Sequence, residues 1–308
     1  MKKGYIFIVL TAFFYSTQEI SGRFLASAAK MDPFQVTFII FLIGAILLSP
    51  LAFRDIKAKN LKIGVNDLGF CALCGALCVP ISMSLLQFAV TYTKASTSAV
   101  LFCTNAVFTV PFAYFFLKEK IKKITLISMV ISLLGVVVIF NPAKLASGIT
   151  GSKDLIGIMF ALGAAVAWSL FTVISKKRIH IYGGYVFNFL AFSFGVIFIF
   201  IILLATGRPI LQGITTKSIF ILLYMGIFIK ALGYIFYLGA IRLTSAVTAS
   251  MVFLIKPALA TILSIIFLGE KIELNIVAGI AFIIVGSYIS FSAGKNSEKK
   301  VEKLTAET

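Results

Sequence analysis

Three ionisable residues lie inside long apolar segments of this 308-residue chain: Glu19, Lys230 and Lys256. A charged side chain at the centre of a membrane-spanning helix costs about 2.5–3.5 kcal/mol on insertion scales, so such residues usually serve a function. Lys230 and Lys256 lie near the middle of their segments, too deep for easy contact with lipid headgroups. Two ammonium groups suit an anion, or a zwitterion that carries a carboxylate or a phosphate.

Polar and aromatic residues on the neighbouring apolar segments extend this set to a predicted cavity lining. Tyr15 and Glu19 lie four positions apart on one helical face, and Lys230 shares a face with two tyrosines. The candidate substrate-binding residues are Lys230, Lys256, Glu19, Tyr15, Gln87, Asn105, Trp168, Asn188, Tyr234 and Tyr237. Glu19 is also the candidate for proton coupling. In the alternative interpretation Glu19 only neutralises one lysine in a structural pair, but buried pairs are weak stabilisers.

The elements that must position these residues are long and apolar. The chain is 60% hydrophobic and 13% charged, with a mean hydropathy of +1.06. A membrane-spanning helix needs about 20 apolar residues. That rule predicts an all-α membrane protein with ten spanning helices, at 4–26, 34–53, 68–91, 95–117, 124–141, 155–175, 184–205, 218–240, 246–268 and 274–292.

The two halves of the chain resemble each other. The stretch 95–121 recurs as 246–272, a shift of 151 positions that also carries Gly75 onto Gly226. We therefore divide the chain into a five-helix repeat at 1–150, a second repeat at 151–293 and a disordered cytoplasmic tail at 294–308. Because each repeat has an odd number of helices, the second must be inverted in the membrane, an arrangement typical of secondary transporters.

The three buried charges break this internal symmetry. The positions equivalent to Glu19, Lys230 and Lys256 hold Thr172, Val79 and Asn105. A residue that only supports the scaffold is expected in both repeats, whereas recognition of one substrate requires no such symmetry. The asymmetry therefore favours a role in binding.

The net charge of +17 follows from membrane topology. With the N-terminus inside, 18 Lys and Arg residues fall on the cytoplasmic side and 8 on the outer side. This bias fits the positive-inside rule and predicts a multi-pass protein of the cell (inner) membrane with both termini cytoplasmic. The expected partners are the lipid bilayer and a small molecule, and nucleic acid is not expected. A second copy of the chain, in a homodimer, is a further alternative.

Other chemistry finds little support in the sequence. Cys71, Cys74, Cys78 and Cys103 lie on two neighbouring segments, and His180 is the sole histidine, in a basic loop. A metal site would need histidine or carboxylate ligands near the cysteines. No phosphate-binding loop or nucleophile motif occurs. We therefore expect no metal, no cofactor and no enzymatic activity, and we interpret the cysteines as packing residues.

The fourth helix of each repeat ends in a related motif, Phe116-Leu117-Lys118-Glu119-Lys120 and Phe267-Leu268-Gly269-Glu270-Lys271. Over essentially its whole length the chain resembles the EamA-type transporters of the drug/metabolite transporter superfamily. The resemblance implies a central cavity lined by helices 1, 3, 4, 6, 8 and 9, with helices 5 and 10 apart from it. Lys118 departs from the glycine that the family usually has. We expect Glu119 and Glu270 to cap the turn into the following helix.

The sequence thus predicts a secondary-active transporter that moves a small anionic or zwitterionic metabolite (an amino acid, organic acid or phosphate ester) by alternating access. One alternative is a proton-coupled exporter of cationic drugs or metabolites that works through Glu19, although the two lysines would repel a cation. An alternative of another class is a membrane receptor or structural protein that transports nothing.

Overall fold

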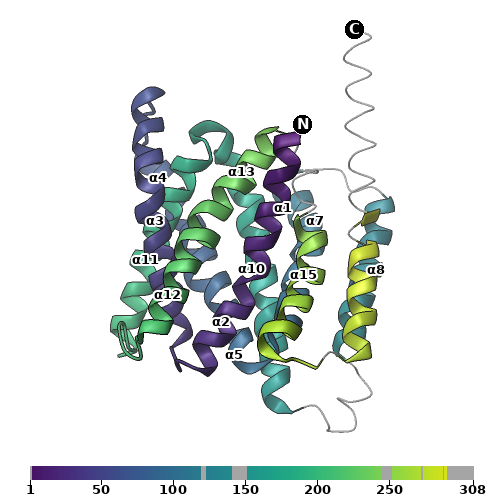
Figure 1. The fold of residues 1–308 in the computed structure, drawn as a ribbon. Helices are drawn as coiled ribbons and strands as arrows, with labels where there is room; N and C mark the ends of the chain where they lie inside the picture. The colour runs from purple at the N-terminus through teal and green to yellow at the C-terminus, as the bar shows by residue number, and fades with distance from the viewer. Residues whose placement is uncertain are drawn as a thin grey trace.

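The protein is a bundle of helices that lie side by side (Figure 1). The computed structural model describes residues 2–118, 123–140, 151–243, 252–271, 273–286 and 288–289, and within these ranges the chain has no strand. In the first half the helices are α1 (Lys2–Ser16), α2 (Gln18–Ser27), α3 (Pro33–Ala58), α4 (Val65–Ala76), η1 (Leu77–Met83), α5 (Ser84–Tyr92), α6 (Ala95–Cys103), α7 (Asn105–Leu117) and α8 (Lys123–Phe140). In the second half they are α10 (Ser152–Tyr182), α11 (Gly184–Ala205), α12 (Thr216–Tyr224), η2 (Met225–Leu232), α13 (Gly233–Leu243) and α15 (Val252–Leu268), followed by a helix at Leu274–Gly286.

Six of the described helices are long and apolar enough to cross a membrane. They cover Pro33–Ala58, Val65–Tyr92, Ala95–Phe116, Ser152–Ile179, Gly184–Ala205 and Thr216–Tyr237, and shorter apolar helices cover Leu259–Leu268 and Leu274–Gly286. The predicted segments at 4–26 and 124–141 correspond to α1 with α2 and to α8. The all-helical fold of a multi-pass membrane protein is therefore confirmed for the described residues, while the tail at 294–308 lies outside them.

Two spans that the sequence predicted as single helices are each interrupted near the middle. The segment 4–26 breaks at Thr17, between α1 and α2, and the segment 95–117 breaks at Thr104, between α6 and α7. At both breaks the threonine hydroxyl donates a hydrogen bond to the carbonyl three residues earlier, at 2.7 Å for Thr17 and 2.6 Å for Thr104. Such bonds compete with the regular α-helical pattern.

Two further spans contain a π-helical segment, η1 in the first half and η2 in the second. Pro80 lies inside η1 and has no N–H group to donate to the preceding turn, so the helix widens there. Irregular backbone is tolerated at membrane depth where it is buried in protein or lines a cavity. The interruptions therefore favour the centre of the bundle as the position of a binding site.

Two close helix contacts are related by the 151-residue shift. A Cβ atom on Gly44 of α3 would lie 2.9 Å from Cβ of Lys230 in η2. At the equivalent positions, a Cβ atom on Gly195 of α11 would lie 2.6 Å from Cβ of Val79 in η1. Glycine is thus required at both places because the facing helix comes too close for a side chain.

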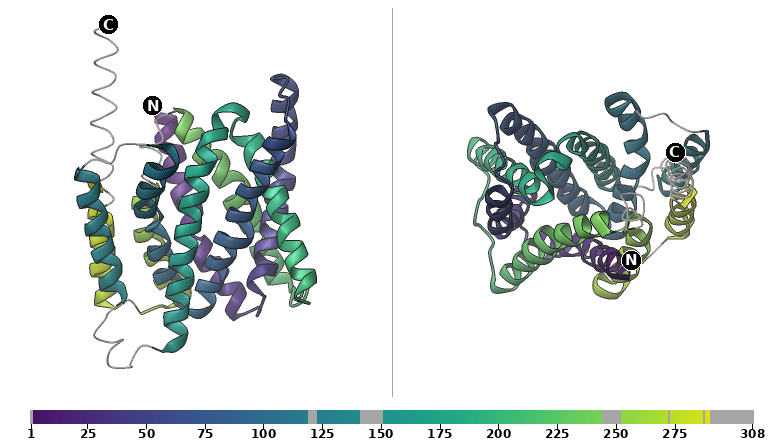
Figure 2. Two further views of the ribbon diagram at one scale, coloured as in Figure 1. Left: turned by 180° about the vertical axis from the view of Figure 1, so that it is seen from behind. Right: turned by 90° about the horizontal axis from the view of Figure 1, so that it is seen from above.

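The helices α8 and Leu274–Gly286 pack together at one edge of the bundle. Gly135 of α8 faces Gly279 and Ile283 of that helix. Both views in Figure 2 show this pair, in teal and yellow, beside the main group of helices. The centre of the bundle is therefore built by the other helices.

Polar contacts at the two ends of the bundle join helices from both halves. At one end Arg178 of α10 forms a 3.1 Å ion pair with Asp67 of α4. At the other end Arg208 forms a 2.6 Å ion pair with Asp32, and Lys94 donates to the carbonyl of Lys271 at 2.9 Å. The charge bias predicts that Lys94 and Lys271 lie on the same side of the membrane, which agrees with their contact.

Candidate functional site

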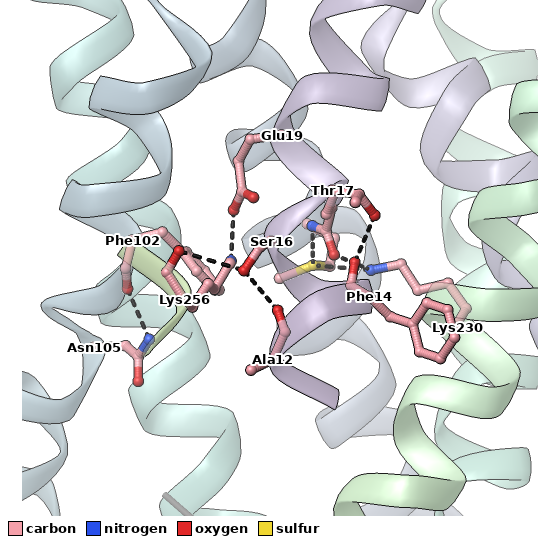
Figure 3. A network of polar contacts seen from close by, with 11 residues as sticks. Ala12, Phe14, Ser16, Thr17, Glu19, Phe102, Asn105, Lys230 and Lys256 are labelled. Atoms are coloured by element: carbon pink, nitrogen blue, oxygen red, sulfur yellow. Dashed lines mark hydrogen bonds and ion pairs between the residues drawn. The ribbon is translucent and has the colours of Figure 1, made fainter. Parts of the chain in front are cut away.

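Three buried charged residues of the bundle, Glu19, Lys230 and Lys256, lie around the break between α1 and α2. Figure 3 shows Lys256 with Glu19 on one side of this segment and Lys230 on the other. Glu19 and its neighbour Gln18 each contact a different lysine. The two lysines that the sequence singled out therefore have different surroundings.

Lys256 is neutralised by Glu19. Its Nζ atom lies 2.6 Å from Oε1 of Glu19, and the two side chains are 2% and 0% exposed. The ammonium group also lies over the ring of Phe102, 4.8 Å from the centroid, which favours a cation. Because the pair is short, buried and hydrogen-bonded, it contributes no net charge to the site.

Lys230 has no such partner. Its Nζ atom donates to Oε1 of Gln18 at 2.9 Å, lies 3.5 Å from Sδ of Met83, and lies 4.6 Å from the centroid of the Phe41 ring. The residue is 1% exposed. Across the described ranges no carboxylate forms an ion pair with it. Its surroundings are neutral dipoles and a ring face, so a positive charge on Lys230 would be uncompensated among the described residues.

A small pocket, here called the central pocket, lies between the two lysines. It is lined by Tyr15, Gln18, Met83, Phe102, Trp168, Lys230, Tyr234 and Lys256. Each of these residues is at most 9% exposed, so the pocket is closed to solvent in this conformation. They come from α1, α2, η1, α6, α10, η2, α13 and α15, which correspond to predicted helices 1, 3, 4, 6, 8 and 9.

Ten residues were predicted from the sequence to bind substrate, and the structure sorts them into three groups. Five of them line the central pocket: Tyr15, Trp168, Lys230, Tyr234 and Lys256. Glu19 contacts the pocket through its pair with Lys256. The other four do not line it: Gln87, Asn105, Asn188 and Tyr237.

The four residues outside the pocket are packed in the helices around it. Gln87 lies against Gly22 of α2, and Asn105 donates to the carbonyl of Phe102 at 2.7 Å. Asn188 is buried on α11, and the ring of Tyr237 lies 6.3 Å from that of Tyr15. Three lining residues were absent from the prediction: Gln18, Met83 and Phe102. Only Gln18, a polar residue within an apolar segment, carried a signal that could have found it.

Three buried polar atoms at the site have no hydrogen-bond partner among the described residues: the hydroxyls of Tyr15 and Tyr234 and Oε2 of Glu19. The Tyr234 hydroxyl has at most the weakly polar thiol of Cys78 beside it. Buried polar groups are nearly always paired, so each exception needs an explanation. The two tyrosines line the same pocket as Lys230, and their hydroxyls together with its ammonium group form a set of donors suited to an anion.

Glu270 serves a purpose different from the predicted one. Its carboxylate accepts hydrogen bonds from the backbone N–H of Ala95 at 2.7 Å and of Ser96 at 3.2 Å, and from the Ser96 hydroxyl at 2.6 Å. It therefore caps the N-terminus of α6 in the other half, and the expected cap on the following helix was wrong. The reason is that the four free N–H groups at a helix start attract a carboxylate. Glu119 lies outside the described residues.

The cysteines occupy packing positions. Cys71, Cys74, Cys78 and Cys103 are all buried and unbridged. Over the described part of the chain, no three His, Cys, Asp or Glu residues gather in a way that could hold a metal ion.

Comparison with known proteins shows that this chain is similar to a family of transporters. The model of the EamA-like transporter family matches residues 2–141 and 155–292. A protein of Clostridium kluyveri, named an uncharacterized transporter, is 71% identical over 98% of this chain and 97% of its own length. The uncharacterized transporter YvbV of Bacillus subtilis is 27% identical over 91% of this chain and 88% of its own. A solved crystal structure superposes with a TM-score of 0.62 at 16% identity, covering 94% of this chain and 97% of that one.

Proposed function

This chain belongs to the EamA-like transporter family, and from that premise we propose that it is a secondary-active carrier of a small anionic or zwitterionic metabolite. The observation that carries the proposal is Lys230, a buried lysine without a carboxylate partner among the described residues, at a closed central pocket. A buried unpaired charge is costly, so a protein keeps it where a ligand of opposite charge repays the cost. Amino acids, organic acids and phosphate esters all supply that charge.

The pairing of Glu19 argues against a cationic substrate. A carboxylate that binds a cation directly must be free to do so, but Oε1 of Glu19 is held by Lys256 at 2.6 Å. A cation in the central pocket would also meet the positive charge of Lys230. Glu19 remains the candidate for proton coupling, because its Oε2 atom has no hydrogen-bond partner in the described part of the chain.

Alternating access between two inverted five-helix halves is the mechanism that this arrangement supports. Four pocket residues come from the half 1–150 (Tyr15, Gln18, Met83 and Phe102) and four from the half 151–293 (Trp168, Lys230, Tyr234 and Lys256). The matched contacts of Gly44 with Lys230 and of Gly195 with Val79 support a common fold for the two halves. A rocking motion of one half against the other would open the pocket to one membrane side at a time.

The proposal is tested by binding and then by transport. The purified protein in detergent is screened by thermal shift against amino acids, organic acids and phosphate esters, since a ligand at a hundredfold excess over Kd adds about 2.7 kcal/mol of stability. Hits are then followed as radiolabelled uptake into proteoliposomes. We expect uptake by the parent and by Lys217→Gln, which changes an exposed lysine far from the pocket, and none by Lys230→Val.

Two results would contradict the proposal. One is uptake by Lys230→Val at the parent rate, which would make the lysine structural. The other is a screen in which only cations stabilise or cross, which would point to the exporter alternative.

A further inference from the structure

With Lys230 protonated, the charges at the central pocket add up to a single positive one. Glu19 and Lys256 cancel each other at 2.6 Å, and Lys230 remains. Among the described residues that line the pocket, no other side chain carries a formal charge. A ligand that neutralises this site therefore brings one negative charge, and a second would be buried without a partner at a high desolvation cost.

The available donors match one carboxylate group. The ammonium group of Lys230 supplies the charge. The buried hydroxyl of Tyr15 has no partner in the described residues, and that of Tyr234 has only the weakly polar Cys78 thiol beside it. Tyr15 and Tyr234 are neighbours, with ring centroids 5.9 Å apart. A carboxylate has two oxygens that accept several hydrogen bonds, so its capacity matches the three donors that line this pocket.

Apart from Gln18 and the paired Lys256, the remaining walls of the pocket are largely apolar. Phe102 and Trp168 have ring centroids 5.9 Å apart, and the Trp168 ring stands edge-on to that of Tyr234 at 6.3 Å. Met83 completes this side of the lining. Such walls offer contact area but few hydrogen bonds, which suits a substrate body without further polar groups.

The side chain of Gln18 occupies the position beside Lys230 that we assign to the carboxylate of the substrate. Its Oε1 atom accepts from Nζ of Lys230 at 2.9 Å, while its Nε2 atom has only Sδ of Met83, a weak acceptor, at 3.6 Å. A neutral amide oxygen is a poorer partner for an ammonium group than a carboxylate. An incoming carboxylate would therefore displace Gln18 from Lys230.

Resting on the proposed function, we propose that the substrate is an organic monocarboxylate with an apolar body, held by Lys230 with Tyr15 and Tyr234, and that Gln18 occupies the carboxylate position when no substrate is bound. The proposal excludes dianions such as phosphate esters and dicarboxylates as the preferred cargo. It also separates the two lysines: Lys230 binds the ligand charge, and Lys256 keeps Glu19 neutralised.

The first test uses the unmodified protein and three probes with one body. Binding of 3-phenylpropionate, 3-phenylpropionamide and phenylsuccinate to the detergent-solubilised protein is measured by titration calorimetry. We expect the monoacid to bind about tenfold to a hundredfold more tightly than the amide, the range that a hydrogen bond to a charged group provides, and more tightly than the diacid. Equal binding of acid and amide, or tighter binding of the diacid, would overturn the proposal.

The same panel distinguishes this inference from the proposed function. If none of the three probes binds while another anion from the screen is bound and transported, the assignment of an apolar monocarboxylate is wrong and the carrier function stands. If no anion or zwitterion of any class binds or crosses, the carrier function itself fails.

The second test places a permanent carboxylate beside Lys230. Gln18→Glu should fold normally, pair with Lys230 and lose binding of 3-phenylpropionate by about tenfold or more. The matched control is Gln212→Glu, which adds the same charge at an exposed position and should bind as the parent does. Parent-like binding by Gln18→Glu would contradict the assignment. Should that variant fail to fold, Lys230→Met must abolish the preference for acid over amide, and a preserved preference would overturn the proposal.

Discussion

Cβ of Lys230 lies 2.9 Å from the position that a Cβ atom on Gly44 would take. The equivalent contact in the other half, between Gly195 and Val79, is made by an uncharged side chain. The close approach of these helices therefore needs a glycine on one side but no charge on the other. Lys230 is an addition to a contact that the fold already makes, which is why we assign it to substrate recognition.

A methyl group at either glycine should separate stability from binding. Gly44→Ala and Gly195→Ala should each destabilise the protein by about 1–3 kcal/mol, because an overpacked contact pushes the facing helix away. Only Gly44→Ala should also weaken ligand binding, since it moves Lys230 while its matched control moves Val79. Melting temperatures and binding constants of the two variants provide the measurement. An equal loss of binding in both would show that the effect is general loosening.

The ion pair of Glu19 and Lys256 should behave as a unit. Removing one partner leaves a buried, uncompensated charge and typically costs about 3–5 kcal/mol, whereas replacing both often costs little. We therefore expect Glu19→Gln and Lys256→Asn to lower the melting temperature more than the double variant does. The cycle of four proteins measures the coupling. Additive losses would mean that the pair is not formed in the membrane.

Glu270 should matter for stability and not for substrate choice. Glu270→Gln weakens three hydrogen bonds at the N-terminus of α6, and loss of a charge-assisted cap should cost about 1–3 kcal/mol. The measurement combines folded yield with the ranking of ligands in the thermal-shift screen. A changed ranking at normal yield would place Glu270 at the substrate and contradict the capping role.

Single cysteines should report the orientation in the membrane. The four native cysteines are buried, so they give little background to an impermeant thiol reagent. We expect Lys217→Cys to react from outside the cell and Lys62→Cys only after the membrane is opened, because both native residues are exposed and the charge bias places them on opposite sides. Labelling in the reverse order would refute cytoplasmic termini.

The sequence predicted the helices better than it predicted the pocket. Hydropathy identifies apolar segments of sufficient length, so the bounds of α11 were found to the residue. It is insensitive to local hydrogen bonding, so the interruptions at Thr17 and Thr104 were missed. For the site, the rarity of charged residues inside a membrane was enough to indicate Lys230 and Lys256.

Which other residues line the pocket depends on how each helix is rotated about its own axis. Asn188 and Gln87 are polar residues on the right kind of segment, yet they do not line the pocket. Phe102 and Met83 line it but look like any apolar residue in the sequence. Which lysine Glu19 would neutralise was also beyond the sequence, because both choices satisfy the same charge count.

If Lys230 alone binds the charge of the substrate, variants at Lys230 and at the Glu19–Lys256 pair should differ in affinity. Binding of the same anionic ligand is measured for Lys230→Val and for the double variant Glu19→Gln/Lys256→Asn, both checked for folding by thermal unfolding. We expect Lys230→Val to lose about tenfold to a hundredfold in affinity, while the double variant stays within about tenfold of the parent. Loss of binding in the double variant with binding preserved in Lys230→Val would contradict it.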